Sequence, residues 1–210
     1  MRRSILFLLS LFVGFNVDGQ FSFAPELGIN MGKLTIDESS LLATGSTTDF
    51  FIGLHTKTLI SQKSAIGFDV EYSRRGFAVL SELDSFPLTQ EPRTEFRYTY
   101  LDFQPYYIYQ LDDRLSFGLG GYIGINIDEE IREQGSNWQD INDQETVSGT
   151  DYGLLINGRY TINNFTLKIE YNHGLKDVSN LLLTDINGNL IGGAKQKLRN
   201  LQVGIAYYLI

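Results

Sequence analysis

Residues 96–127 alternate between apolar and polar positions in two long stretches that flank a short polar segment, residues 111–114. In the second stretch one parity is apolar and the other is small or polar. The apolar parity consists of Leu115, Phe117, Leu119, Ile123, Ile125 and Ile127. A period of two is typical of a β-strand with one apolar face. Each stretch exceeds the usual strand of about five or six residues and reaches the roughly 9–11 residues of a membrane-spanning strand, so the pair predicts a hairpin of an outer-membrane barrel.

The same alternation predicts eight strands along the chain. They are residues 21–32, 49–60, 65–75, 96–110, 115–127, 151–161, 165–175 and 197–210. Their connections alternate in length, and the long ones are residues 33–48, 76–95, 128–150 and 176–196. Outer-membrane barrels have an even number of strands, short periplasmic turns and long outer loops. The sequence therefore predicts an all-β fold, an eight-stranded antiparallel up-and-down transmembrane β-barrel with short periplasmic turns and long extracellular loops.

Charged residues share the strand face opposite the aliphatic residues on many strands. A soluble barrel such as a lipocalin has the reverse arrangement, with apolar residues inside. We therefore assign the aliphatic residues to the lipid and the charged ones to the lumen. The predicted lumen charges are Glu26, Lys57, Asp69, Glu71, Arg75, Asp102, Arg159, Lys168 and Glu170. Acids and bases are nearly balanced in this set, and they should pair across the interior because an unpaired buried charge is costly.

Two functions are open for such a lumen. It could be a gated polar conduit for a small solute, or a plug of structural salt bridges. Eight strands leave an interior that side chains fill, which favours the plug. Pro105 leaves one ambiguity, because proline cannot donate a ladder hydrogen bond and can mark a bulge, after which the inward and outward assignment would reverse.

The N-terminus has the features of a secretory signal peptide. Arg2 and Arg3 precede an apolar run, residues 5–15, that is too short to cross a membrane as a helix. We expect residues 1–19 to be removed, leaving one domain, residues 20–210. That change shifts the net charge from −8 to −9, and such an acidic chain is a poor partner for nucleic acid. The chain has no cysteine, which excludes a lipoprotein anchor, disulfides and thiolate chemistry.

The third long connection is acidic and also carries the single tryptophan of the chain. The residues that we consider for binding there are Asp128, Glu129, Glu130, Glu133, Trp138, Asp140 and Asp143. They could bind a divalent cation, a partner surface, or lipopolysaccharide through bridging cations. No stretch has the spacing of a calcium loop, and we favour a solvated, mobile loop over a binding site as the explanation of this composition. Trp138 could anchor a ligand or fold onto the barrel rim.

His55 and His173 are the only histidines. Some small outer-membrane barrels are lipid-modifying enzymes that use a histidine with a serine or carboxylate, and His173 lies near Asp177 and Ser179. Proximity in sequence is weak support for such a site. Two distant histidines without cysteines also make a poor ligand set, so we expect neither catalysis, nor a metal, nor a cofactor.

Three segments carry a further signal: residues 50–54 (FFIGL), 65–76 (AIGFDVEYSRRG) and 100–105 (YLDFQP). In their order and spacing they resemble the PorT-like outer-membrane β-barrel family, which has a short strand motif, a hairpin arm and a later tyrosine-led motif ending in proline. The chain departs from the family pattern where Gln104 shifts the proline by one position. The resemblance implies an eight-stranded barrel in the outer membrane of Gram-negative bacteria. Some members are linked to protein secretion, but the resemblance implies no shared activity.

These observations lead to one expected role and two alternatives. We expect a non-enzymatic structural or binding protein of the outer membrane that presents extracellular loops to a ligand or protein partner. The alternatives are a narrow-solute channel and an outer-membrane lipid-modifying enzyme. We expect the barrel to be a monomer surrounded by outer-membrane lipid and lipopolysaccharide.

Overall fold

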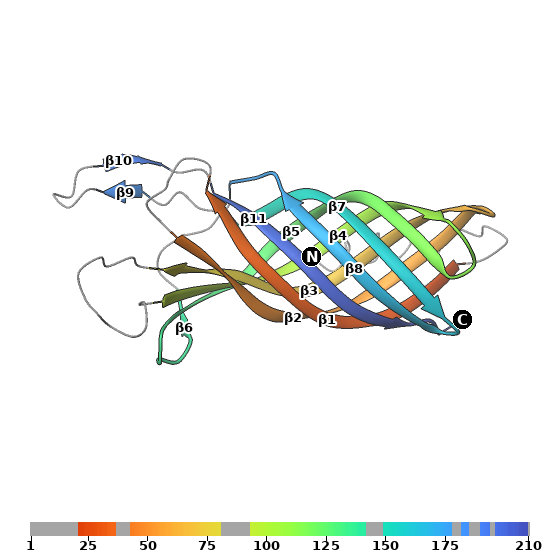
Figure 1. Ribbon diagram of the computed structural model, residues 1–210, viewed down its shortest axis with the longest axis horizontal. Helices are drawn as coiled ribbons and strands as arrows, with labels where there is room; N and C mark the ends of the chain where they lie inside the picture. The colour runs from red at the N-terminus through yellow and green to blue at the C-terminus, as the bar shows by residue number, and fades with distance from the viewer. Residues whose placement is uncertain are drawn as a thin grey trace, which may run out of the picture.

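The computed structural model describes residues 21–36, 43–80, 93–141, 149–177, 182–184, 190–193 and 196–209, and within them every long element is a β-strand (Figure 1). The long strands are β1 (Phe21–Ile36), β2 (Ala43–Ser61), β3 (Ser64–Leu80), β4 (Arg93–Gln110), β5 (Leu115–Glu133), β7 (Thr150–Ile162), β8 (Phe165–Gly174) and β11 (Gln196–Tyr207). The short strands are β6 (Gln139–Asp140), β9 (Leu182–Thr184) and β10 (Leu190–Gly193). The described residues include no helix that is long and apolar enough to cross a membrane.

The eight long strands form a closed ring. Each pairs antiparallel with the long strand that precedes it in the chain, and β1 pairs with β11 to close the sheet. This arrangement confirms the predicted eight-stranded antiparallel up-and-down barrel. β6 adds to the outer end of β5, and β9 and β10 form a separate hairpin within the fourth long connection.

The two ends of the barrel differ in their connections. Tight turns join β2 to β3, β4 to β5 and β7 to β8, and Asn163 in the last of these adopts a positive φ of 54°. β6, β9 and β10 lie beyond the opposite end (Figure 1). Short turns face the periplasm in outer-membrane barrels, so we refer to the two ends as the turn end and the outer end.

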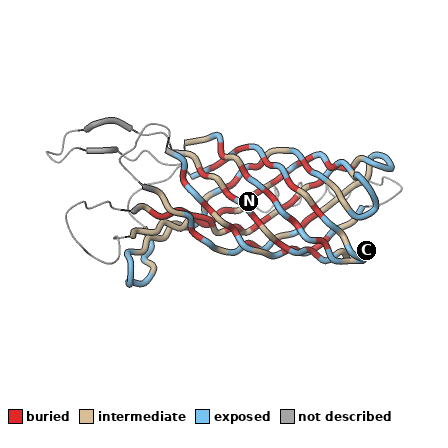
Figure 2. The backbone as a smooth tube through the Cα atoms, viewed as in Figure 1, coloured by how far each residue is buried: buried red, intermediate tan, exposed pale blue. Residues whose placement is uncertain are grey.

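The two faces of the strands have the predicted polarity. Along most strands buried and exposed residues alternate (Figure 2). Leu119 is 65% exposed and Ile52 is 56% exposed, whereas Asp69 and Glu71 are completely buried. Aliphatic residues therefore form the lipid-facing surface and ionisable residues fill the lumen, as predicted.

An exposed aromatic belt surrounds the turn end. It contains Phe21, Phe23, Tyr107, Tyr109, Phe117, Tyr160, Phe165 and Tyr207. Aromatic girdles of this kind lie at the interface between hydrocarbon and water in outer-membrane barrels. The belt therefore marks the level at which the turn end leaves the membrane.

Pro105 does not reverse the inward and outward assignment. The pairing of β3 with β4 keeps one register through Phe68 and Pro105, and Tyr106 beyond the proline still points inward. The bulge considered at Pro105 is absent there, and the register shift between β4 and β5 instead falls between Thr99 and Tyr100. The missing N–H group interrupts a local hydrogen bond without inserting an extra residue, because Pro105 is otherwise compatible with extended backbone.

Several strands are longer at the outer end than the alternation predicts. β5 continues to Glu133, so Asp128, Glu129, Glu130 and Glu133 lie on a strand and the prediction that this stretch belongs to a loop is wrong. The apolar alternation ends where the strand leaves hydrocarbon, but backbone pairing between β4 and β5 continues to Thr94 and Glu133. Asp140 lies on β6, and Asp143 lies outside the described residues.

Candidate functional site

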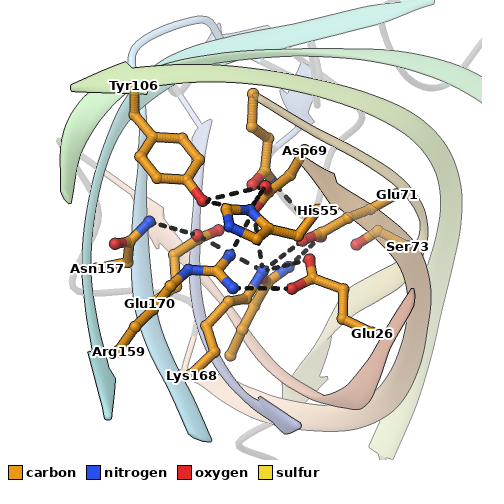
Figure 3. A network of polar contacts seen from close by, with 12 residues as sticks. Glu26, His55, Asp69, Glu71, Ser73, Tyr106, Asn157, Arg159, Lys168 and Glu170 are labelled. Carbon is orange, nitrogen blue, oxygen red and sulfur yellow. Dashed lines mark hydrogen bonds and ion pairs between the residues drawn. The ribbon is translucent and has the colours of Figure 1, made fainter. Parts of the chain in front are cut away.

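The centre of the lumen holds a buried charged cluster, which we call the central network. It consists of Glu26, His55, Asp69, Glu71, Arg159, Lys168 and Glu170, with Tyr106 and Asn157 at its edge (Figure 3). Strand register brings these residues to one level of the barrel, since His55 is paired with Asp69 and Arg159 with Lys168. Alternation then points the side chains of these positions into the lumen.

Two cations occupy the middle of the central network. Arg159 donates through Nη1 to Glu26 at 3.2 Å and through Nη2 to Asp69 at 2.6 Å. The Lys168 ammonium lies 3.1 Å from Glu26 and 3.6 Å from Glu170, and it also contacts Glu71. Each carboxylate is therefore bound by at least one charged donor, as expected for ionised groups with no access to water.

His55 connects the central network to the turn end. Its Nδ1 lies 2.5 Å from Asp69 and its Nε2 lies 3.1 Å from the Tyr208 hydroxyl. Tyr106 donates its hydroxyl to the same carboxylate at 3.0 Å. His55 points inward, as the parity of β2 predicts, and is held on both ring nitrogens.

A second charged cluster lies nearer the outer end. Arg75 donates to both oxygens of Asp102 at 3.1 Å and to Asp151 at 3.2 Å. Tyr122 donates its hydroxyl to Asp151 at 3.0 Å, and the Arg75 guanidinium lies 4.2 Å from the centroid of the Tyr100 ring. Two carboxylates and an aromatic face thus surround the buried guanidinium through its two terminal amino groups, while its Nε has no hydrogen-bond partner among the described residues.

The structure changes the predicted set of lumen charges at two positions. Lys57 is only half-buried, lies over the Tyr208 ring with its Nζ 5.2 Å from the centroid, and forms no ion pair with another described residue. Asp151, which is absent from the predicted set, is completely buried and forms an ion pair with Arg75. Asp151 shares the parity of Arg159, so the alternation of β7 puts it on the lumen face, but its burial at the strand end depends on the ion pair with Arg75.

These changes overturn the predicted near-balance of charge. The buried acids of the described lumen are Glu26, Asp69, Glu71, Asp102, Asp151 and Glu170, and the buried bases are Arg75, Arg159 and Lys168. Neutral amides compensate in part, because Gln104 and Gln202 donate to Glu71 at 3.3 and 3.1 Å. The lumen therefore has an excess of acids that are bound by neutral donors as well as by cations.

Three central carboxylates are close enough to suggest a metal site. Single oxygens of Glu26, Asp69 and Glu71 all lie within 4.8 Å of one another. The Lys168 ammonium already contacts Glu26 and Glu71 and lies 3.8 Å from Asp69. These oxygens therefore serve a protein cation, and the arrangement fits an ammonium group better than a metal ion.

An apolar cluster fills the lumen at the outer end. It is formed by Leu34, Phe77, Tyr98, Tyr100 and Leu198, which come from β1, β3, β4 and β11. Elsewhere large and small residues fit together, since a Cβ atom at Gly120 would lie 2.4 Å from the Cβ of Tyr106. The interior is thus occupied by side chains at several levels, as eight strands predict.

The acidic segment at the outer end forms a third charged cluster, the outer-rim network. Arg97 donates to Asp49 at 3.0 Å and pairs with Glu130 at 3.4 Å, and Arg132 pairs with Glu95. Trp138 packs on the guanidinium groups of Arg97 and Arg132, 3.7 and 4.4 Å from its ring centroid. Trp138 was expected either to anchor a ligand or to fold onto the barrel rim, and the structure shows it folded onto the rim.

The two histidines do not come together. His173 is half-buried, and the centroid of its ring lies 6.1 Å from that of Tyr171. It has no hydrogen bond or ion pair with the described residues. Ser179, its suggested partner, lies outside the described residues. No histidine–serine–carboxylate arrangement is therefore formed by the described chain.

Comparison with known proteins places the chain in a family. Residues 7–180 match the family described as outer membrane protein beta-barrel domain. No curated protein sequence matches the chain. Because the family match spans well over half of the sequence, it establishes membership independently of structural similarity.

Solved structures that are similar to this barrel have low sequence identity. Ail, the attachment invasion locus protein of Yersinia pestis, is 10% identical with a TM-score of 0.47, over 91% of this chain and 100% of Ail. Neisserial surface protein A is 15% identical with a TM-score of 0.46, and the match covers 90% of this chain and 99% of that protein. The outer membrane protease OmpT from Escherichia coli is 14% identical with a TM-score of 0.40, and the match covers 92% of this chain and 98% of OmpT. At these values the similarity says nothing about activity. By its sequence match the chain belongs to the outer membrane protein beta-barrel domain family, and it is a β-barrel protein of the bacterial outer membrane.

Proposed function

We propose that this protein is a non-enzymatic structural or binding protein whose outer rim and loops meet a ligand or partner at the cell surface. The observation that carries the proposal is the occupied lumen, in which paired charges fill the centre and an apolar cluster fills the outer end. A barrel filled in this way has little room for a solute path, so its distinctive surface is the rim that projects beyond the membrane.

The outer rim has the properties of a binding platform. Its strands extend past the apolar alternation, and ion pairs of Arg97 and Arg132 link neighbouring strands. Trp138 packs against both of these arginines, and aromatic and arginine side chains are common anchors of binding surfaces. Lipopolysaccharide and a surface-exposed protein are the partners that we propose, and the closed ring, which has no free strand edge within the membrane, favours a monomer.

Two measurements test this function. In a planar lipid bilayer the purified barrel should give no steady current, and a steady current would instead support the narrow-solute alternative. Trp138 is the only tryptophan, so its fluorescence reports directly on the outer rim. We expect its emission to shift when vesicles of purified lipopolysaccharide or a captured partner are added, and an unchanged spectrum would argue against binding at the rim.

The enzymatic alternative has weaker support. Both ring nitrogens of His55 already have partners in Asp69 and Tyr208, and His173 lacks a carboxylate partner among the described residues. Replacing both histidines with alanine should leave lipid A and phospholipid composition unchanged in cells that produce the barrel. A change in lipid turnover that depends on either histidine would support the lipid-modifying enzyme instead.

We also propose that the chain belongs to the PorT-like branch of outer-membrane barrels of Gram-negative bacteria and loses residues 1–19 as a signal peptide. The three resembling segments lie on the consecutive strands β2, β3 and β4, which keeps their order and spacing in space. Mass spectrometry of the membrane-inserted protein should give Gln20 as the first residue. Replacement of a PorT-like barrel by this chain in a secretion assay tests the branch assignment.

A further inference from the structure

A cavity of about 230 Å³ lies at the turn end, on the side of the central network opposite the outer rim. Turn residues 112–114 and Asn163 form its edge, and His55 and Arg159 form its inner wall. The cavity is therefore a recess that faces the periplasm and ends on the buried charges. Its volume is below the roughly 300–1,000 Å³ of pockets for drug-sized ligands, so it suits a small group.

The wall of this recess, which we call the turn-end pocket, is rich in cationic and hydrogen-bond-donating side chains. Those groups are Ser22, His55, Lys57, Gln110, Arg114, Ser116, Arg159, Thr161, Asn163 and Tyr208. Two carboxylates, Asp112 and Asp113, also line it. Asp112 accepts backbone N–H groups of Arg114 and Leu115 at 2.7 Å each, and these bonds hold the carboxylate in the turn without removing its negative charge. Lysine and arginine side chains of the pocket wall thus outnumber its carboxylates by three to two, and Lys57 is a cation of the wall without a carboxylate partner among the described residues.

Several of these donors have no acceptor in the described chain. The Oγ of Ser22 and the Nε of Arg159 are buried without a hydrogen-bond partner among the described residues. The Lys57 ammonium lies 5.2 Å from the centroid of the Tyr208 ring, and no carboxylate of the described residues pairs with it. Buried donors normally have acceptors, so unpartnered groups that line one recess point to an acceptor supplied from outside the chain.

The acids behind the pocket do not fill this role. Glu26 and Asp69 are engaged by both amino groups of the Arg159 guanidinium and by Lys168. They do not line the pocket, although their charge will weaken the attraction of an anion. A ligand with a single negative charge and a short apolar body would match the cationic wall and the side chains of Ile108 and Leu115.

We propose that the turn-end pocket binds a carboxylate group that enters from the periplasm, with Lys57 and Arg159 as its cationic wall and Tyr208 beside it. The carboxylate belongs to a small organic acid or to the end of a short peptide. This site is independent of the proposed role of the outer rim, since it lies at the opposite end of the barrel.

The test titrates the refolded full chain in detergent micelles with benzoate, followed by calorimetry. Neutral benzamide and cationic benzylamine serve as matched probes, and the dipeptide alanyl-alanine tests a peptide end. We expect saturable binding of benzoate and at least about tenfold weaker binding of benzamide, because a charge-assisted hydrogen bond is lost. Tighter binding of alanyl-alanine than of benzoate would indicate that a peptide end is the natural source of the carboxylate, and the reverse would indicate a small organic acid.

Variants identify the site. Lys57→Gln should weaken benzoate binding about tenfold, whereas Lys63→Gln, which removes an exposed lysine of the neighbouring turn outside the pocket wall, should not. Lys57 lies outside the central network, and heat-modifiable gel migration will confirm that the variant still folds. Absence of benzoate binding, equal binding of benzamide, preference for benzylamine, or equal effects of the two variants would each overturn the proposal.

Discussion

The central network and the outer-rim network contain the same kinds of residue at similar distances but in different surroundings. Arg159 lies 3.2 Å from Glu26 in the lumen, and Arg97 lies 3.0 Å from Asp49 at the rim. Side chains of the lumen ion pairs are at most 3% exposed, whereas those of the rim are 8–38% exposed. Distance alone therefore does not distinguish the two networks.

The difference between these networks shows that burial decides what an ion pair contributes. A half-exposed pair is screened by water and is worth about 0–1 kcal/mol. Loss of one partner from a buried pair leaves an uncompensated charge and costs roughly 3–5 kcal/mol. The central network should consequently control the stability of the barrel, and the outer-rim network should chiefly control the shape of the surface.

The largest effect is expected for Lys168→Met. This change removes the ammonium that contacts Glu26, Glu71 and Glu170, so the free energy of unfolding should fall by roughly 3–5 kcal/mol. Urea unfolding of the refolded barrel in lipid vesicles, followed by heat-modifiable gel migration, measures the change. A loss below about 1 kcal/mol would show that the lumen network behaves like a surface network.

Adding Glu71→Gln to Lys168→Met should restore part of the lost stability. The second change removes one of the carboxylates left without its cation, while Gln104 and Gln202 remain as neutral neighbours. A double-mutant cycle gives the coupling between Lys168 and Glu71, which we expect to exceed about 1 kcal/mol because the groups are in contact. Simple additivity of the two changes would contradict the pairing seen in the lumen.

Arg97→Met should have a much smaller effect on stability. Its ion pairs with Asp49 and Glu130 are partly exposed, so their loss and that of the stacking on Trp138 should together cost about 1 kcal/mol or less. The Trp138 emission should nevertheless change clearly, because one of its two flanking cations is removed. A loss in the free energy of unfolding as large as that caused by Lys168→Met would show that the rim stabilises the barrel as much as the central network does.

Salt should separate the networks further. Raising NaCl from about 0.1 to 1 M shortens the Debye length from about 10 to 3 Å. The stability difference between the wild type and Arg97→Met should then shrink by a few tenths of a kcal/mol, while the difference for Lys168→Met should persist because water does not reach the lumen pairs. Equal salt sensitivity of both variants would indicate that solvent enters the central network.

The smallest effect concerns Asp112, in the β4–β5 turn outside both networks. Backbone N–H groups of Arg114 and Leu115 donate to this carboxylate and hold its pKa below the usual value. Because the folded pKa is the lower one, the stabilisation is present above the unfolded pKa of about 3.9 and is lost as the pH falls through the folded pKa. Wild type and Asp112→Ala should therefore differ slightly at neutral pH and converge in acid. An NMR titration that gave the Asp112 carboxyl a pKa at or above the usual value for aspartate would contradict this prediction.

Most of the barrel could be predicted because its rules are local. Alternation along each strand assigned Glu26, Asp69 and Lys168 to the lumen without knowledge of any neighbour. The same rule placed the strand that contains Asp151 correctly but did not assign this residue, since a carboxylate at a strand end can also lie in water. Burial of Asp151 depends on Arg75, which is distant in sequence and adjacent only in the closed ring.

The outer end shows the opposite case. The sequence indicated a loop from residue 128 because the apolar alternation stops there, yet β5 continues to Glu133. Its continuation depends on cross-strand partners such as Arg97 for Glu130, and no pattern within one strand reports a partner on another. The sequence makes Trp138 a candidate for binding, but its packing against two arginines depends on the folded rim.

By itself, the sequence determined the all-β class, the number of long strands, the end at which the long connections lie and the face of each strand that meets lipid. These properties follow from a two-residue period and from the cost of placing charge in hydrocarbon. Only the tertiary structure decided which charges pair, that Lys57 stands apart from the central network, and that a recess opens at the turn end. Those outcomes depend on strand register around the closed ring, which sets distances between residues that are far apart in the chain.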